Sequence, residues 1–255
     1  MLPDDCRVCG LALTNFSRIP VCEPCLRSVQ PFAAEYFCAA CRAPFLNEHP
    51  LDEHGLCALC RQGLNGFDLA YSFGYYDGTL RKLIHLYKYQ GIRTLAGPLG
   101  ALLARSLPLD RQFDVVTPMP LHWRRMLSRG FNQSALLAAH LAKRIHAPVR
   151  GLLRKRKSTP KQAGLTGSER RKNVSGAFGL ARGANVKDLR ILLVDDVLTT
   201  GATASAAAAV LRRAGAKSIT VLTVARVDRR VLLSDIKADS FGYRAAHGGG
   251  GSTPA

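Results

Sequence analysis

The chain has 255 residues, 47% of them hydrophobic, and a formal net charge of +18. This apolar content supports one well-buried core and a smaller companion unit, which excludes a disordered chain. No apolar run approaches the roughly 18 residues of a membrane span, and the first residues lack the basic-then-apolar pattern of a signal peptide. We therefore expect a globular, cytoplasmic protein without a membrane span, whose eight cysteines lie in a reducing compartment.

The positive charge is unevenly distributed along the chain. Residues 1–66 carry five Lys/Arg against seven Asp/Glu, whereas residues 122–172 carry fourteen Lys/Arg against one acid, a formal balance of +13. A field of this sign attracts phosphates and longer polyanions. The alternative is a solubilising basic surface, because charge alone does not specify a ligand.

Four Cys-x-x-Cys pairs occupy residues 6–60. They are Cys6/Cys9, Cys22/Cys25, Cys38/Cys41 and Cys57/Cys60. Two intervening residues allow a tight turn that directs both sulfurs at one ion, and two such turns complete a tetrahedral site. The pairs therefore predict two Zn²⁺ sites, which are structural because cysteines fill every ligand position. Disulfides or redox dithiols are the alternative, which the reducing compartment disfavours.

The four pairs can combine into two metal sites in three ways. We favour sequential grouping, because it closes two loops of similar, short length at little cost in entropy, and an interleaved arrangement remains open. The cysteine-rich segment is too short and polar to fold without metal. We expect residues 1–66 to form a small double zinc ribbon.

From Gly66 onward, strand and helix patterns alternate. Strands are predicted at 67–76, 113–117, 191–194 and 218–225. Helices are predicted around 80–87, 95–107, 132–145 and 203–213, the second interrupted by Gly97-Pro98. This alternation predicts an α/β domain over residues 67–240, with a mostly parallel sheet covered on both faces. A basic, mobile loop is predicted over 155–175 and a flexible tail over 241–255.

The strongest chemical signal is the strand-to-helix segment from Ile191 to Thr203. Four apolar residues precede Asp195 and Asp196, and the run Thr199-Thr200-Gly201-Ala202-Thr203 leads into an alanine-rich helix. A helix N-terminus offers N–H groups and a partial positive charge to an anion, and Gly201 lets the backbone approach it. Ionised carboxylates only accept hydrogen bonds, which suits neighbouring sugar hydroxyls. The segment predicts a 5-phosphoribose site; the alternative is that the acids merely end a strand and a threonine caps the helix.

On this segment the sequence resembles the type I phosphoribosyltransferases, whose signature loop is matched by Val194 to Thr203. Further motifs are similar to those of the ComF family, phosphoribosyltransferase-like proteins with a double zinc ribbon. They are Leu86-Tyr87-Lys88-Tyr89-Gln90-Gly91, Pro118-Met119-Pro120-Leu121-His122, Arg129-Gly130-Phe131-Asn132-Gln133, and the stretch from Gln162 through Asn173 to Phe178. The resemblance covers nearly all of residues 4–227.

The resemblance implies a sheet of the type I phosphoribosyltransferase kind that binds 5-phosphoribosyl-1-diphosphate (PRPP) with Mg²⁺. Asp195 and Asp196 would hold the ribose hydroxyls, and Thr199 to Thr203 the 5-phosphate. The implied PRPP-binding residues are Asp195, Asp196, Val197, Leu198, Thr199, Thr200, Gly201, Ala202 and Thr203. The turn at Met119-Pro120 would approach the diphosphate, and the basic loop from Lys157 to Arg170 would close over it. Met119 stands where related sequences often carry valine, an apolar exchange of small effect.

Four further cationic side chains are candidate anion contacts. They are Lys88, Arg124, Arg125 and Arg129. Guanidinium groups can neutralise a diphosphate, although a lysine that ends a helix also suits the helix dipole. Trp123 either stacks on a base or packs as a partly buried aromatic. His122 either exchanges protons near pH 7 or makes an ordinary hydrogen bond, and no catalytic residue is assigned.

Three functional hypotheses follow. The first is phosphoribosyl transfer to an unidentified acceptor, in which Mg²⁺ and basic groups stabilise the departing diphosphate. ComF membership implies a link to competence and the processing of incoming DNA. The second is therefore a non-catalytic PRPP sensor or single-stranded-DNA-binding protein, because a charge of +13 exceeds what one diphosphate needs. The third is a zinc-dependent scaffold for competence-machinery proteins, against which the phosphate loop argues.

Overall fold

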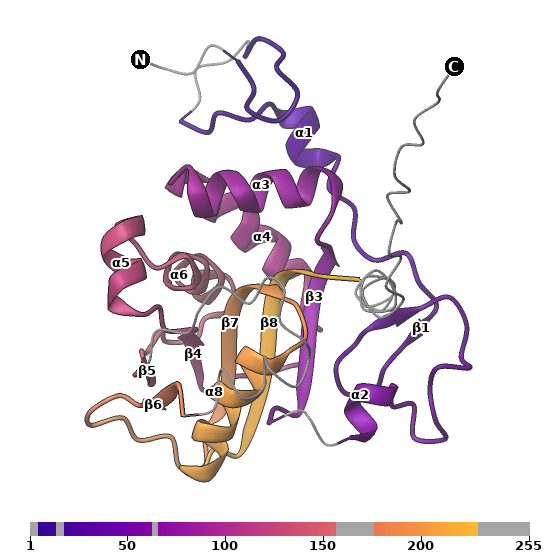
Figure 1. Cartoon of the computed structure of the whole chain (residues 1–255), viewed down its shortest axis with the longest axis vertical. Coiled ribbons are helices and arrows are strands. Elements are labelled where there is room, and N and C mark those ends of the chain that lie inside the picture. The colour runs from indigo at the N-terminus through magenta and orange to yellow at the C-terminus, as the bar shows by residue number, and fades with distance from the viewer. Residues whose placement is uncertain (1–4, 14–17, 63–65, 157–175, 229–255) are drawn as a thin grey trace, which may run out of the picture.

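The structure, a computed structural model, describes residues 5–13, 18–62, 66–156 and 176–228. In chain order the elements are α1 (Glu23–Arg27), β1 (Tyr36–Phe37), β2 (Pro44–Phe45), α2 (Ala58–Arg61), β3 (Leu69–Tyr75), α3 (Gly78–Tyr89), η1 (Arg93–Leu95), α4 (Ala96–Ser106), β4 (Val115–Pro118), α5 (Trp123–Arg129), α6 (Gln133–Ile145), β5 (Leu153–Lys155), β6 (Phe178–Leu180), β7 (Arg190–Leu198), α8 (Ala202–Arg213) and β8 (Ser218–Arg226) (Figure 1). The loop predicted to close over the diphosphate, from Lys157 to Arg170, and the tail predicted over 241–255 lie outside the described residues.

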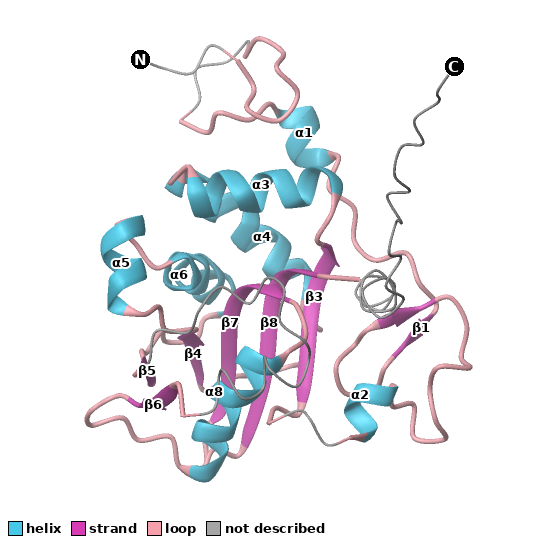
Figure 2. Ribbon diagram, in the orientation of Figure 1, coloured by secondary structure: helices cyan, strands magenta, loops and turns pink. Residues whose placement is uncertain are grey.

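A four-stranded sheet forms the centre of the molecule. Its strand order is β3-β8-β7-β4, and each neighbouring pair is parallel. Alternate residues of a strand point to opposite faces, and both faces of β7 are apolar: Leu192 and Val194 enter one core, Ile191 and Leu193 the other. Helices α3, α4 and α6 cover the first face, and α8 covers the second (Figure 2). The predicted α/β class and parallel sheet are confirmed.

The two cysteine-rich segments pack on opposite sides of this sheet. Cys6 and Val21 join the core beneath α3 and α4, whereas Cys38, Cys41 and Cys57 join the core beneath α8. Figure 1 shows the first segment beside α1 and the second around β1 and α2. Each segment therefore shares its apolar interior with the sheet. The domain boundaries at residues 66 and 240 stay predictions.

Two local predictions need correction. The strand predicted at 191–194 continues to Leu198, because its backbone ladder with β8 pairs Asp195 with Thr223 and Leu198 with Arg226, and ladder bonds do not require apolar side chains. Gly97-Pro98 does not interrupt α4. Both residues lie in its first turn, where a proline costs no helical hydrogen bond.

Helix α5 was not predicted at all. It is seven residues long and carries three arginines, so it has no apolar stripe to reveal it. Its boundaries are set locally: the Nδ1 of His122 accepts a hydrogen bond from the Arg124 N–H at 3.3 Å, and Gly130 ends the helix with φ 70°. Within the described part of the chain, none of the helices combines the length and apolar character needed to cross a membrane.

Candidate functional site

The loop between β7 and α8 lies at the carboxyl edge of the parallel sheet, where ligands of open α/β folds bind. Gly201 caps α8 with φ 82°, a left-handed conformation that favours glycine. The Thr200 Oγ1 accepts a hydrogen bond from the Ala202 N–H at 3.4 Å. The first turn of α8 thus directs its N–H groups toward the end of β7, which is the arrangement that binds an anion.

Asp195 and Asp196 lie near the carboxyl end of β7, and both side chains contact the same helical layer. Strict strand alternation would send adjacent side chains to opposite faces. Instead, the Asp195 Oδ1 accepts a hydrogen bond from the Ser134 Oγ of α6 at 2.9 Å, and the Asp196 Oδ1 lies 2.7 Å from the Lys88 Nζ of α3. Both helices belong to one layer. Both carboxylates therefore contact the layer formed by α3 and α6, in the strand that leads through Gly201 into α8.

The environment of Asp195 perturbs its titration. Burial raises the pKa of Asp195 to about 6, the neighbouring Asp196 carboxylate adds to the rise, and the Lys88 ammonium opposes it. Burial also works to lower the pKa of Lys88, but the Asp196 carboxylate outweighs it and the pKa is raised. The acids and Lys88 form a compact, mutually dependent charge cluster.

The Met119-Pro120 turn is joined to this cluster through Asn132. The Met119 N–H donates to the Val194 carbonyl of β7 at 2.8 Å, and the Asn132 Nδ2 donates to the Met119 carbonyl at 3.1 Å. The Oδ1 of Asn132 also accepts from the Ser134 N–H at 3.0 Å and so caps α6. One side chain thus holds the predicted diphosphate turn and positions Ser134 against Asp195.

Asn132 and Ser134 were not predicted as site residues. The available signal was the capping pattern at the start of a confident helix, but capping by itself says nothing of proximity to an acid on β7. The same region positions Lys88, because the hydroxyl of its neighbour Tyr87 donates to the Gln133 carbonyl at 2.7 Å. The start of α6 therefore connects α3, β7 and the proline turn.

The candidate cations are placed differently from one another. Lys88 contacts Asp196 directly, and Arg125 influences the site through Lys155. By contrast, the Arg129 guanidinium donates to the Gln133 Oε1 at 3.2 Å and lies 5.4 Å from the Tyr89 ring centroid. Arg124 lies over the Trp123 ring, 5.3 Å from its centroid. Lys88 thus faces the acids and Arg125 lies near Lys155, whereas Arg124 stacks on Trp123 and Arg129 is held by Gln133.

Lys155 is a further cation of the site that sequence reasoning treated only as the start of a loop. It ends β5, with its Nζ 5.5 Å from the Phe178 ring centroid. Burial lowers its pKa, the nearby Arg125 lowers it further, and Asp195 opposes both. Lys155 therefore lies within electrostatic reach of both Asp195 and Arg125.

The aromatic and imidazole side chains of the proline turn have separate environments. His122 is buried and serves as the cap of α5, which is the ordinary hydrogen-bonding interpretation. Trp123 is 60% exposed, so its ring is available to stack on a partner.

The eight cysteines form two clusters in the sequential grouping. The first contains Cys6, Cys9, Cys22 and Cys25, and the second Cys38, Cys41, Cys57 and Cys60. Within each cluster the sulfurs lie within 4.8 Å of one another. In the second, the Cys38–Cys60 and Cys41–Cys57 sulfurs are 3.5 and 3.7 Å apart. Tetrahedral Zn–S bonds of ~2.3 Å give sulfur–sulfur edges of about 3.8 Å, so these clusters can hold a metal ion.

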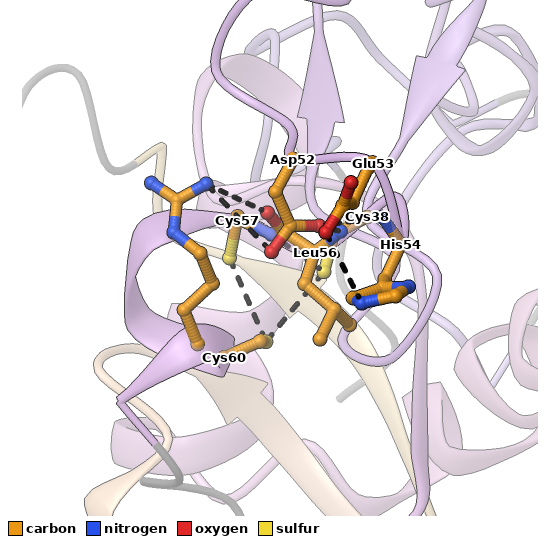
Figure 3. A network of polar contacts seen from close by, with 8 residues as sticks. Cys38, Asp52, Glu53, His54, Leu56, Cys57 and Cys60 are labelled. Carbon is orange, nitrogen blue, oxygen red and sulfur yellow. Dashed lines mark hydrogen bonds and ion pairs between the residues drawn. The ribbon is translucent and has the colours of Figure 1, made fainter.

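Backbone donors prepare both clusters for negative charge. The Cys22 N–H donates to the Cys6 Sγ, and the Cys57 N–H to the Cys38 Sγ, each at 3.3 Å. Near the second cluster, Asp52 holds the turn that precedes Cys57: its Oδ1 accepts hydrogen bonds from the His54 and Leu56 N–H groups at 3.0 and 2.7 Å (Figure 3). The two N–H contacts to sulfur stabilise thiolates, the form that binds metal.

Comparisons with known proteins agree with this architecture. The phosphoribosyl transferase domain family matches residues 132–243. The chain is 30% identical over 217 residues to Competence protein F of Haemophilus influenzae, covering 81% of this chain and 90% of that protein. It is 29% identical over 232 residues to the DNA utilization protein YhgH of Salmonella typhimurium, covering 88% of this chain and 98% of that protein.

Among solved structures, the chain is similar to the glutamine PRPP amidotransferase of B. subtilis in complex with ADP and GMP. The two share 24% sequence identity with a TM-score of 0.36, over 51% of this chain. The chain spans only 26% of the length of that protein.

The parallel sheet, the β7–α8 loop and the domain match together define a protein of the phosphoribosyltransferase type. Similarity of this extent to Competence protein F then identifies the family. The chain belongs to the ComF family, and it carries two four-cysteine clusters ahead of its phosphoribosyltransferase domain.

Proposed function

We propose that this protein binds PRPP at the carboxyl edge of its sheet and transfers phosphoribose to an acceptor, in connection with the use of incoming DNA. The observation that supports it is the contact of both Asp195 and Asp196 with the layer of α3 and α6, in the strand that leads through Gly201 into α8. The carboxylates would accept from two ribose hydroxyls, and the N–H groups of Thr199 to Thr203 would bind the 5-phosphate.

The surrounding cations suit the diphosphate. Lys88 contacts Asp196, and Lys155 lies within electrostatic reach of Asp195 and of Arg125. The Met119-Pro120 turn adds backbone groups held by Asn132. In this proposal Lys88 leaves Asp196 when a ribose hydroxyl arrives and pairs with the diphosphate instead. Charge developing on the leaving diphosphate is then neutralised by groups already in place.

The carboxylate oxygens fit Mg²⁺, which prefers hard oxygen ligands and takes most of them from substrate phosphates and water. When bound, Mg²⁺ would neutralise diphosphate charge. The protein's own part would be to orient the ribose on the two acids and to hold the phosphate on α8.

Calorimetric titration with PRPP and Mg²⁺ tests this proposal. We expect saturable binding to the metal-loaded protein, and at least about 100-fold weaker binding by the Asp195→Asn/Asp196→Asn double variant. Two hydrogen bonds to charged acceptors are worth roughly 1.5–3 kcal/mol each. Asp114→Asn, at the other end of the sheet, is the matched control and should bind as the native protein does. Absence of heat with the native protein would overturn the proposal, and diphosphate release with candidate acceptors separates a transferase from a sensor.

A second candidate function is binding of single-stranded DNA, and the surface of α5 favours it. Trp123 and Leu127 are 60% and 75% exposed, and Arg124 stacks beside the indole. Exposed aromatic rings combined with arginines bind single strands by base stacking and phosphate pairing. The relatives named for competence and DNA utilization agree with such a partner.

Charge reversal on α5 tests the DNA hypothesis. We expect Arg124→Glu/Arg125→Glu to weaken oligonucleotide binding by at least about 10-fold. The salt dependence of binding should also fall, because the variant contacts fewer phosphates and its binding therefore releases fewer counterions. Arg182→Glu/Arg213→Glu makes the same charge change at two exposed positions outside α5. Fluorescence anisotropy across a salt series measures both. Equal losses in the two double variants would reject α5 as the site.

We further propose that both cysteine clusters hold Zn²⁺ as structural sites and that the protein acts in the cytoplasm. Four sulfurs at tetrahedral spacing suit this ion, and reduced cysteines persist in that compartment. Competence-machinery proteins as partners are a proposal that rests on the names of the relatives.

A further inference from the structure

Arg226 connects the end of β8 to the second cysteine cluster. Its side chain is only 1% exposed and is among the largest fully buried side chains of the described residues. Its Nη1 donates to the Cys41 carbonyl at 2.7 Å, and its Nη2 lies 3.9 Å from the Cys41 Sγ. A guanidinium thus reaches a metal-ligating sulfur 185 positions earlier in the sequence.

The burial of this arginine has an electrostatic explanation. A buried cation is costly unless a nearby anion compensates it. Four thiolates around Zn²⁺ carry a net charge of −2. Cys38 and Cys41 are fully buried, so water does not screen that charge. The cluster and Arg226 therefore stabilise each other, in the way that hydrogen bonds around a metal site support its ligands.

The same arginine is joined to the phosphate loop through the backbone. Leu198, the residue before Thr199, pairs with Arg226 in the sheet, and its carbonyl accepts from the Val227 N–H at 3.0 Å. The Arg226 carbonyl accepts from the Tyr76 N–H at 2.8 Å. Arg226 therefore ties the second cluster to the strand end from which the loop starts.

The first cluster is connected elsewhere. Its segment contacts α3 and η1, through the Lys82 Nζ on the Val8 carbonyl at 3.4 Å and the Thr94 Oγ1 on the Arg18 carbonyl at 3.0 Å. These contacts lie on the opposite side of the sheet from Arg226 and Cys41. The two clusters are thus placed to act differently on the loop.

We propose that Arg226 is the counter-cation of the second cysteine cluster and a positioning residue for the phosphate loop, so that metal at this cluster, rather than at the first, maintains the order of residues 198–203. The proposal rests on the proposed zinc occupancy and deepens the proposed PRPP site. It assigns the second cluster a role in preparing that site, beyond stabilising its own segment.

The test compares Arg226→Met, which keeps the length and removes the charge, with Arg226→Lys, which keeps the charge and loses the forked donor. Arg190→Met is the matched control, because it removes an arginine that pairs with Asp114 at the opposite end of β7. Zinc content and the rate of zinc transfer to a chromophoric chelator are measured on the full chain. Hydrogen exchange of residues 198–203 is measured alongside, and neither readout requires PRPP.

We expect two zinc ions per native chain and, in Arg226→Met, release of one of them about 10- to 100-fold faster, with lost exchange protection over 198–203. Arg226→Lys should show an intermediate rate of zinc release and intermediate exchange protection. If Arg226→Met does not fold, Arg226→Lys is compared with the native protein instead. Arg190→Met should release zinc at the native rate. Native zinc release and loop protection in the folded Arg226 variants, or a native protein without zinc, would overturn the proposal. If only PRPP binding fails, the proposed function is contradicted and the proposed role of Arg226 is not.

Discussion

Asp195→Asn is expected to stabilise the folded protein by about 3 kcal/mol at pH 7.5 while it weakens PRPP binding. Burial raises the pKa of Asp195 to about 6, against about 3.9 for an unfolded aspartate, and each unit corresponds to about 1.4 kcal/mol. Asparagine removes the buried charge, and its Oδ1 can still accept from the Ser134 hydroxyl and the Asp196 N–H. A functional carboxylate is thus held at a cost in stability.

The sign of the effect depends on pH. Because the folded-state pKa of Asp195 is the higher one, the folded protein binds more protons than the unfolded chain between about pH 4 and 6. Burial of the Asp195 carboxylate therefore does not destabilise the native protein below about pH 4, and this destabilisation grows as the pH rises through 6. The advantage of Asp195→Asn should be small at pH 4 and complete above pH 7.

Urea denaturation of both proteins between pH 4 and 8 measures this difference. Asp114→Asn provides a control of opposite sign, because the Arg190 side chain lowers the pKa of Asp114 to about 2 and its ion pair stabilises the fold at neutral pH. If Asp195→Asn were destabilising at pH 7.5, Asp195 would not carry the burial penalty inferred from its surroundings.

Removal of metal from both clusters is expected to destabilise the protein by on the order of 5 kcal/mol, which is comparable to the whole stability of many domains. Cys38, Cys41 and Cys57 lie in the same core as Ile191 and Leu193 of β7. Without an ion, buried thiolates repel or must be protonated, and the apolar packing around them is lost. A fall in Tm of roughly 10–20 °C follows for a chain of this size.

Single substitutions separate the two clusters. Cys57→Ser removes a buried ligand beside the sheet core, whereas Cys9→Ser removes an exposed ligand of the first cluster. We expect Cys57→Ser to lower the free energy of unfolding more than Cys9→Ser does, because packing of the sheet core is disturbed as well. Differential scanning calorimetry of the zinc-loaded proteins, with zinc content checked by elemental analysis, gives the comparison. Equal losses would show that depth in the core does not decide the contribution of a cluster.

Much of the fold was predictable because its signals are local. The apolar run at 191–194 and the helical spacing after Asn132 indicated a strand and a helix, and Gly201 marked the turn between strand and helix. The Cys-x-x-Cys spacing predicted two metal clusters, since two residues between cysteines bring their sulfurs together in any context. Helix α5 escaped prediction because a short basic helix has no apolar period.

The sequence by itself determined the α/β class, the position of the acid pair before a helix N-terminus and the eight cysteines as ligands of two clusters, whereas the structure decided that the pairs group sequentially. Only the tertiary structure decided that both carboxylates face α3 and α6, that Lys155 and Ser134 join them, and that the cysteine clusters lie on opposite sides of the sheet. Periodicity reports which face of an element is buried, not which distant element covers it. The contact between Arg226 and Cys41 spans 185 positions and exists only because β8 and the second cluster pack against each other.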